Sequence, residues 1–133
     1  MRRTRLFSLL ALLALVLLAG CDTRLPTLPR FQPQVINTPN DFGLQTGVLE
    51  QATEEVQYLW RNDSTSTSVI QSPTNLTGDA SLFILDGAGT QVYQRSLAEN
   101  GTFTTTKGVP GDWTIRVRLR EVSGALSLRL RKQ

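Results

Sequence analysis

The fold of this chain is decided by the stretch 113-WTIRVRLREVSGALSLRLRK-132, in which apolar and polar residues alternate on either side of a central turn signal. An apolar residue stands at every second position from Trp113 to Leu119 and again from Leu126 to Leu130. A period of two is typical of a β-strand with one buried face, because successive side chains of a strand point to opposite sides. The stretch therefore predicts two strands.

Ser123-Gly124 predicts a two-residue turn that joins these strands into a hairpin. In that register Leu119 faces Leu128 and Val117 faces Leu130, so both apolar rows fall on one side of the sheet. The same register sets Arg118 opposite Arg129 and Arg116 opposite Arg131.

The sequence before this stretch shows the same alternation in shorter segments. Val56, Tyr58 and Trp60 indicate one strand, Ser81 to Arg95 indicates a hairpin around an Asp-Gly-Ala-Gly turn, and Thr102 to Thr106 indicates another strand. Seven or eight short strands without a helical segment predict an all-β fold. We expect a small antiparallel, jelly-roll-like β-sandwich over residues 44–133, with the tryptophans Trp60 and Trp113 in its core.

Three segments of this region, 78-GDASLFILD-86, 108-GVPGDWTIRV-117 and 123-SGALSL-128, resemble the small jelly-roll modules of bacterial exported proteins, such as pre-peptidase C-terminal domains. The resemblance implies an accessory, non-catalytic module. The chain departs from that family in lacking the acidic cluster with which some members bind calcium. No metal site or other cofactor is therefore expected, and Asp86 and Asp112 are interpreted as turn residues.

A proline-rich stretch precedes the domain. Four of the six prolines lie between Asp22 and Phe42, where proline disfavours both helix and sheet. Residues 21–43 are therefore predicted to form a semi-extended tether without persistent sheet. Its apolar residues are expected either to pack against the edge of the domain or to dock a partner protein; they are Leu25, Leu28, Phe31, Val35 and Ile36.

The first 21 residues have the three parts of an export signal. A basic start is followed by an almost purely apolar run from Leu6 to Leu18, about 13 residues long and too short for a membrane-spanning helix of about 20. Leu18-Ala19-Gly20-Cys21 resembles a bacterial lipobox. The resemblance implies that residues 1–20 form a signal helix, that cleavage falls between Gly20 and Cys21, and that Cys21 is lipidated.

A lipid on Cys21 would hold the protein on the cell membrane, facing outside the cytoplasm. Asp22 resembles an inner-membrane retention signal of enterobacteria-like sorting. Two alternatives remain open for the leader, an ordinary signal peptide with an incidental cysteine and an uncleaved anchor.

The composition argues against several functional classes. Removal of the leader's three arginines would leave 11 basic and 11 acidic groups, so the charge indicates no nucleic-acid partner. The single cysteine forms no intrachain disulfide, and the absence of histidine removes the usual hydrolase sites and the commonest zinc ligand. No motif supports a serine–lysine dyad with Lys107, so no catalytic residue is assigned and no enzyme is expected.

The last 21 residues are strongly basic, with Glu121 as their only acidic group. The candidate binding residues for an anionic partner are Arg116, Arg118, Arg120, Arg129 and Arg131. One interpretation is a solvated face balanced by carboxylates such as Glu54 and Glu55 on a neighbouring strand. The other is an envelope partner, a lipid, glycan or protein, since a guanidinium binds phosphate or carboxylate through two hydrogen bonds.

The sequence therefore predicts a membrane-anchored lipoprotein with a non-catalytic β-sandwich that binds a partner at the cell envelope. The alternative is a structural spacer with no specific ligand.

Overall fold

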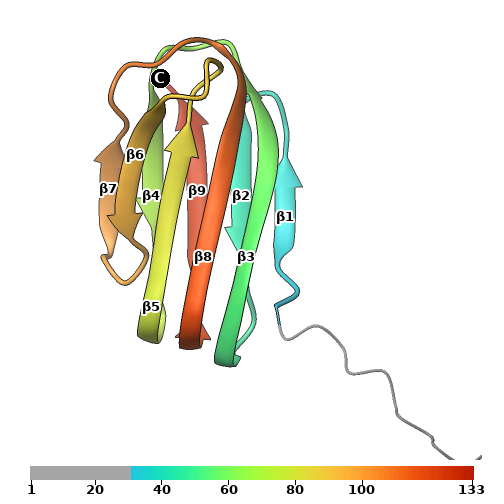
Figure 1. Cartoon of the computed structure of the whole chain (residues 1–133), viewed down its shortest axis with the longest axis vertical. Helices are drawn as coiled ribbons and strands as arrows, with labels where there is room; N and C mark the ends of the chain where they lie inside the picture. Colours follow the sequence, from blue (N-terminus) through green and yellow to red (C-terminus); the bar gives the residue numbers. More distant parts are fainter. Residues whose placement is uncertain (1–30) are drawn as a thin grey trace, which may run out of the picture.

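Two antiparallel sheets face each other in residues 31–133, the part of the chain that the structure, a computed structural model, describes (Figure 1). The strands are β1 (Gln34–Asn37), β2 (Asp41–Gln45), β3 (Leu49–Asn62), β4 (Thr67–Gln71), β5 (Thr74–Leu85), β6 (Gln91–Ser96), β7 (Gly101–Thr104), β8 (Gly111–Ala125) and β9 (Ser127–Lys132). Residues 31–133 include no helix with the length and hydropathy of a membrane span.

The strand order identifies the sandwich as a jelly roll. Sheet A has the order β1-β2-β9-β4-β7 and sheet B has the order β3-β8-β5-β6. With β1 set aside, the two four-stranded sheets have the connectivity of an eight-stranded jelly roll. The predicted fold class, an all-β antiparallel sandwich, is confirmed; the predicted signal helix lies outside the described residues.

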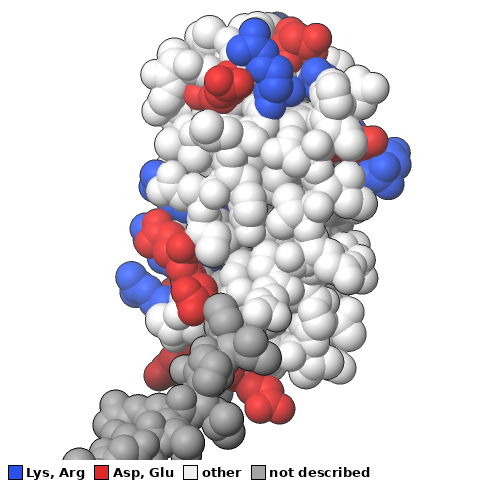
Figure 2. All heavy atoms as spheres, turned by 90° about the vertical axis from the view of Figure 1, so that its right-hand side faces the viewer, with Lys and Arg blue, Asp and Glu red and all other residues white. Residues whose placement is uncertain are grey.

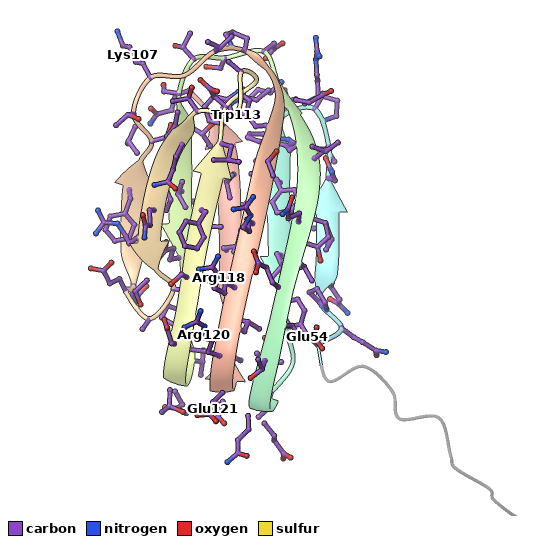
Figure 3. The ribbon with its side chains drawn as sticks, viewed as in Figure 1. Glu54, Lys107, Trp113, Arg118, Arg120 and Glu121 are labelled. Atoms are coloured by element: carbon purple, nitrogen blue, oxygen red, sulfur yellow. The ribbon has the colours of Figure 1, made fainter. Side chains whose placement is uncertain are left out.

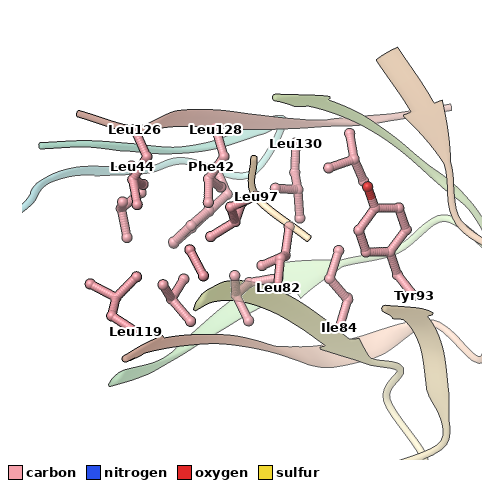
Figure 4. Close-up of a cluster of buried hydrophobic side chains, with 14 of the residues drawn as sticks. Phe42, Leu44, Leu82, Ile84, Tyr93, Leu97, Leu119, Leu126, Leu128 and Leu130 are labelled. Carbon is pink, nitrogen blue, oxygen red and sulfur yellow. The ribbon is translucent and has the colours of Figure 1, made fainter. Parts of the chain in front are cut away.

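The core lies between the sheets and is built from the inward rows of the alternating strands (Figure 4). Phe42, Leu128 and Leu130 of sheet A face Leu82 and Leu119 of sheet B, and each of them is at most 2% exposed. Burial of each large apolar side chain stabilises the fold by about 1.5–3 kcal/mol relative to leaving that side chain exposed.

The two tryptophans are core residues, as predicted. Trp60 of β3 and Trp113 of β8 are register partners, and both are 0% exposed. Each indole N–H has a hydrogen-bond partner. The Nε1 of Trp60 donates to the Thr38 carbonyl at 2.8 Å, and the Nε1 of Trp113 donates to the Val109 carbonyl at 2.9 Å.

The hairpin predicted around Ser123-Gly124 is wrong. β8 continues to Ala125 and pairs with β3 and β5 in sheet B, whereas β9 pairs with β2 and β4 in sheet A. Both apolar rows do face one core, but they face it from opposite sheets. The alternation of the sequence is the same in the two arrangements, because each requires only that every second residue point inward.

The prediction that no sheet persists in residues 21–43 is also wrong, because β1 and the first residues of β2 lie within this range. Pro33 directly precedes β1 and Pro39 lies in the turn between β1 and β2, so neither proline removes a hydrogen bond from a strand interior. The folded region thus begins before residue 44.

Packing against the domain, one of the two predicted roles for the apolar residues of this stretch, is confirmed for Phe31. Phe31 is 6% exposed and belongs to the core cluster, so it packs against the domain. Val35 and Ile36 of β1 remain 38% and 63% exposed. Leu25 and Leu28 lie outside the described residues.

The hairpin predicted for Ser81 to Arg95 is confirmed as β5 and β6, with Ile84 opposite Tyr93. Its turn is held by the carboxylate of Asp86, which accepts hydrogen bonds from the backbone N–H groups of Val109, Thr90 and Ala88 at 2.8–3.0 Å. These donors, the Val109 N–H first, hold the pKa of Asp86 below its ordinary value.

Candidate functional site

The five candidate arginines lie on two separate faces of the sandwich. Arg116, Arg118 and Arg120 belong to β8 and lie on the outer face of sheet B, where Figure 3 shows the latter two. Arg129 and Arg131 belong to β9 and lie on the outer face of sheet A. The single arginine face implied by the predicted hairpin is therefore absent from the described structure, and Arg118 does not oppose Arg129.

On sheet B, Arg116 and Arg118 share one carboxylate from the neighbouring strand. Glu55 of β3 is the register partner of Arg118. Its Oε1 lies 3.7 Å from the Nε of Arg116, and its Oε2 lies 3.6 Å from the Nε of Arg118. The cluster carries two positive charges and one negative charge, so it keeps a net positive charge. Arg120 lies farther along β8, opposite Asp79 of β5.

Phe83 of β5 completes this cluster from the other side of β8. The Cζ atom of Arg118 lies 5.1 Å from the centroid of the Phe83 ring, within the range of a cation–π contact. Phe83 is also the register partner of Arg116 on one side and of Gln94 on the other. We call the group Glu55, Phe83, Arg116 and Arg118 the arginine platform.

The two arginines of the platform are partly buried. Their side chains are 30% exposed in Arg116 and 39% exposed in Arg118. The Nε atom of Arg116 is buried and has no hydrogen-bond partner within the described residues. Within residues 31–133 the Nη atoms of these two arginines donate no hydrogen bond, so both guanidinium groups can bind a ligand.

On sheet A, Arg129 and Arg131 share Asp41 of β2 in a similar way. The Oδ2 of Asp41 lies 3.3 Å from an Nη of Arg129, and its Oδ1 lies 3.4 Å from the Nε of Arg131. These arginine side chains are more exposed, at 50% and 52%. The two clusters thus match in charge and differ in burial and in the aromatic ring.

The charges of the molecule are not spread evenly. Figure 2 looks onto the edge formed by β1 and β3 and shows basic and acidic groups on its flanks and at its two ends, with an uncharged middle. Glu54 and Glu121 lie toward the lower end in Figure 3, the end at which the described chain enters the fold. Arg120 lies at the same level as Glu54, so this end carries both signs of charge, whereas the arginine platform lies on the broad face of sheet B.

Sequence reasoning identified Glu55 as a partner for the arginines but missed Phe83 and Asp41. The period of two could have found Phe83, since Leu82 and Ile84 take the inward positions and leave the ring outside. Asp41 had no such signal, because it lies in the stretch expected to be a tether. Gly20 and Cys21, the predicted cleavage and lipidation sites, lie outside the described residues.

No protein-family model matches the chain, and no curated protein matches it. Among solved structures it is similar to PliG of Aeromonas hydrophila, a periplasmic inhibitor of g-type lysozyme, at 14% identity over 75% of this chain and 92% of that chain, with a TM-score of 0.49. It is also similar to a Bacillus endospore appendage protein, at 14% identity over 84% of this chain and 98% of that chain, with a TM-score of 0.41. A third similar structure, at 14% identity, is the CBM36-1 domain of a xylanase from the hindgut metagenome of Trinervitermes trinervoides, with 75% and 85% of the two chains covered and a TM-score of 0.36. Sequence identities and TM-scores as low as these carry no information about a ligand of this chain.

Proposed function

We propose that this chain is a lipid-anchored bacterial lipoprotein whose β-sandwich is a non-catalytic module that binds an anionic partner at the cell envelope through the arginine platform of sheet B. The observation that carries the proposal is the sharing of one carboxylate, that of Glu55, by two partly buried arginines. The partner supplies the carboxylate or phosphate groups that the two guanidinium forks lack.

The platform favours binding because its arginines are already positioned. Glu55 and the Phe83 ring restrict the two side chains before a ligand arrives. Ordering a flexible side chain at an interface costs about 0.5–1.5 kcal/mol, and this cost falls when the side chain is held in advance. The more exposed arginines on sheet A have no such ring against them, so sheet B is the better candidate.

The position of the platform favours a partner other than the anchoring bilayer. Phe31 lies ten positions after Cys21, and a fully extended chain covers at most about 35 Å over that distance. A lipidated Cys21 would place the lower end of the sandwich, where the described chain enters the fold, nearest the membrane, and the arginine platform does not lie at that end. The platform on the broad face would remain open to soluble or wall-bound polyanions and to acidic proteins.

The test of this surface compares two matched double variants of the immobilised full chain in an envelope extract. Arg116→Gln/Arg118→Gln changes sheet B, and Arg129→Gln/Arg131→Gln makes the same charge change on sheet A. We expect the wild type and the sheet A variant to retain a common partner that the sheet B variant loses. Retention should weaken as salt is added, because the contact is exposed and ionic.

Equal retention by the wild type and both variants would instead place the contact outside the arginines, and retention of no partner by the wild type would support the alternative function, a structural spacer without a specific ligand. That alternative is favoured by the carboxylates themselves, since Glu55 and Asp41 already balance part of each arginine pair. A spacer would also show no dependence of retained material on salt.

The anchor is tested separately with Cys21→Ala. We expect the wild type to sediment with the membrane fraction and to incorporate labelled palmitate, and the variant to do neither. A variant that stays in the membrane fraction would contradict the lipid anchor and would favour an uncleaved apolar leader.

A further inference from the structure

A groove lies on the outer face of sheet A, away from the arginine platform. It has a volume of about 390 Å³ and is lined by residues of β1, β2 and β9. Gly43 of β2 forms its floor, with Ile36 of β1 on one side and Arg129 of β9 on the other in the same register row. The volume lies in the range of small-molecule sites, which is roughly 300–1,000 Å³.

The glycine at the floor of this groove is not required by the backbone. Gly43 is not among the residues with a positive φ angle. A Cβ atom added there would lie 3.7 Å from the Cβ of Ile36 and 3.9 Å from the Leu128 carbonyl, both ordinary contacts. By contrast, a Cβ at Gly124 would lie 2.3 Å from the Asn75 carbonyl. Glycine weakens a strand interior, so its presence at position 43 has a use other than the fold.

That use is the open space itself. A side chain at position 43 would stand on the outer face of the sheet and fill the floor between Ile36 and Arg129. Glycine leaves the peptide backbone accessible to a ligand, which is the role a glycine in a strand often has.

The walls of the groove combine an apolar surface with groups that both donate and accept hydrogen bonds. Ile36 is 63% exposed and supplies the apolar wall. Gln34 and Gln45 are register partners and place two amides at one end of the groove. Among the hydrogen bonds within residues 31–133, none comes from these two amides. At the other end Asp41 accepts a hydrogen bond from Arg129 at 3.3 Å.

This chemistry fits a neutral sugar better than an anion. Sugar hydroxyls both donate and accept, as amides do, and a sugar ring has an apolar face that packs on a side chain such as Ile36. The groove lining includes one carboxylate, Asp41, and one guanidinium, Arg129, so the lining itself has no net charge and Asp41 disfavours an anion there, although Asp41 is also shared with Arg131 outside the lining. We propose that the Gly43 groove binds a neutral glycan unit, a second binding site that is independent of the arginine platform.

Calorimetric titration of the full chain in mild detergent tests this site. The probes are maltotriose, cellotriose and triacetylchitotriose as neutral trisaccharides, with trigalacturonate as the acidic comparison. We expect at least one neutral probe to bind, and Gly43→Val to weaken that binding at least tenfold while leaving the thermal unfolding temperature unchanged or higher.

Two controls make the result specific. Gly47→Ala adds a Cβ with nothing within 4 Å and lies outside the groove lining, so it should bind as the wild type does. Arg116→Gln/Arg118→Gln should also leave sugar affinity unchanged, which separates this site from the platform. Should Gly43→Val fail to fold, Gln45→Ala, which alters only an exposed outward side chain, should weaken the same binding.

The inference would be overturned by any of three results. The first is that no neutral probe binds at its highest soluble concentration. The second is that folded Gly43→Val binds like the wild type. The third is that trigalacturonate alone binds and that folded Gly43→Val weakens its binding, which would assign the groove to an anion.

Discussion

A buried hydrogen-bond network closes the sandwich beside β6, and the variant Tyr93→Phe tests how much it stabilises the fold. The hydroxyl of Tyr93 donates to the Oε1 of Gln71 at 2.7 Å. The Nε2 of Gln71 donates in turn to the carbonyls of Ser96 at 2.9 Å and Glu99 at 2.8 Å. Gln71 is 1% exposed and Tyr93 is 7% exposed, so neither side chain has ready access to bulk water.

The expected magnitude follows from this burial. Tyr93→Phe removes one hydrogen bond between neutral groups and leaves the Oε1 of Gln71 buried without its donor, a loss of about 1–3 kcal/mol in unfolding free energy. For a domain of this size each kcal/mol lowers the unfolding temperature by about 4–8 °C. We therefore expect the variant to unfold at least about 4 °C below the wild type.

Urea unfolding followed by tryptophan fluorescence measures the change, because Trp60 and Trp113 are both fully buried in the folded state. Tyr58→Phe is the matched control. Tyr58 lies at the core margin, its hydroxyl forms no hydrogen bond within the described residues, and its loss should change the free energy of unfolding by less than about 0.5 kcal/mol. Gln71→Leu and the double variant complete a cycle whose coupling energy should exceed about 0.5 kcal/mol.

The same network gives a pH dependence. Burial raises the pKa of Tyr93 to about 12, from an ordinary value of 10.0. Because the folded-state pKa is the higher one, the associated stability is fully present below pH 10.0 and is lost as the pH rises toward 12. The difference between wild type and Tyr93→Phe should therefore be constant near neutrality and shrink above pH 10.0. A variant as stable as the wild type at pH 7, or a difference unchanged at alkaline pH, would refute this account of the network.

Three further predictions concern the β5–β6 turn, the close approach of β8 to β5 and the arginine platform. Asp86→Asn should destabilise the fold near neutrality, and because the folded pKa of Asp86 is the lower one, the difference from wild type should disappear as an acid titration, followed by circular dichroism, falls below about pH 4. Gly124→Ala should lose more than about 1 kcal/mol in urea unfolding, since its φ of +99° disfavours a side chain and the Asn75 carbonyl occupies the space; an unchanged midpoint would contradict the tight approach of β8 to β5. Glu55→Gln should strengthen retention of an anionic partner and steepen its salt dependence, whereas weaker retention would contradict this expectation and show that the positioning of the arginines by Glu55 outweighs its negative charge.

The β5–β6 turn and the Ser123-Gly124 pair show how far local sequence predicts this fold. The β5–β6 turn was predicted correctly because its residues act on each other: the carboxylate of Asp86 binds backbone groups two and four residues later. Ser123 does not act in this way, since its hydroxyl instead accepts a hydrogen bond from the Gln51 N–H across the sheet. A serine–glycine pair whose hydroxyl binds a neighbouring strand therefore has the same sequence as a pair that closes a hairpin.

The candidate site was predictable to the extent that it depends on one strand. The alternation of β8 placed its arginines on an outer face, and Glu55 was among the carboxylates expected beside them. Asp41 was not foreseen because it pairs with Arg129 across 88 residues of sequence. Such contacts depend on which strands become neighbours in a sheet, and the period of two carries no information about that choice.

The division of the arginines into two clusters determines which experiments can identify a binding surface. If β8 and β9 formed a hairpin, a combined change at Arg118 and Arg129 would alter one face. In the jelly roll that pair lies on opposite sheets, so a loss of binding would not show which sheet the partner contacts. Pairs chosen within a sheet remove two charges around a single carboxylate in each case, Glu55 on sheet B and Asp41 on sheet A. Since the net charge then changes equally, long-range attraction is matched between the two variants, and any difference in retention arises from local contacts with one face.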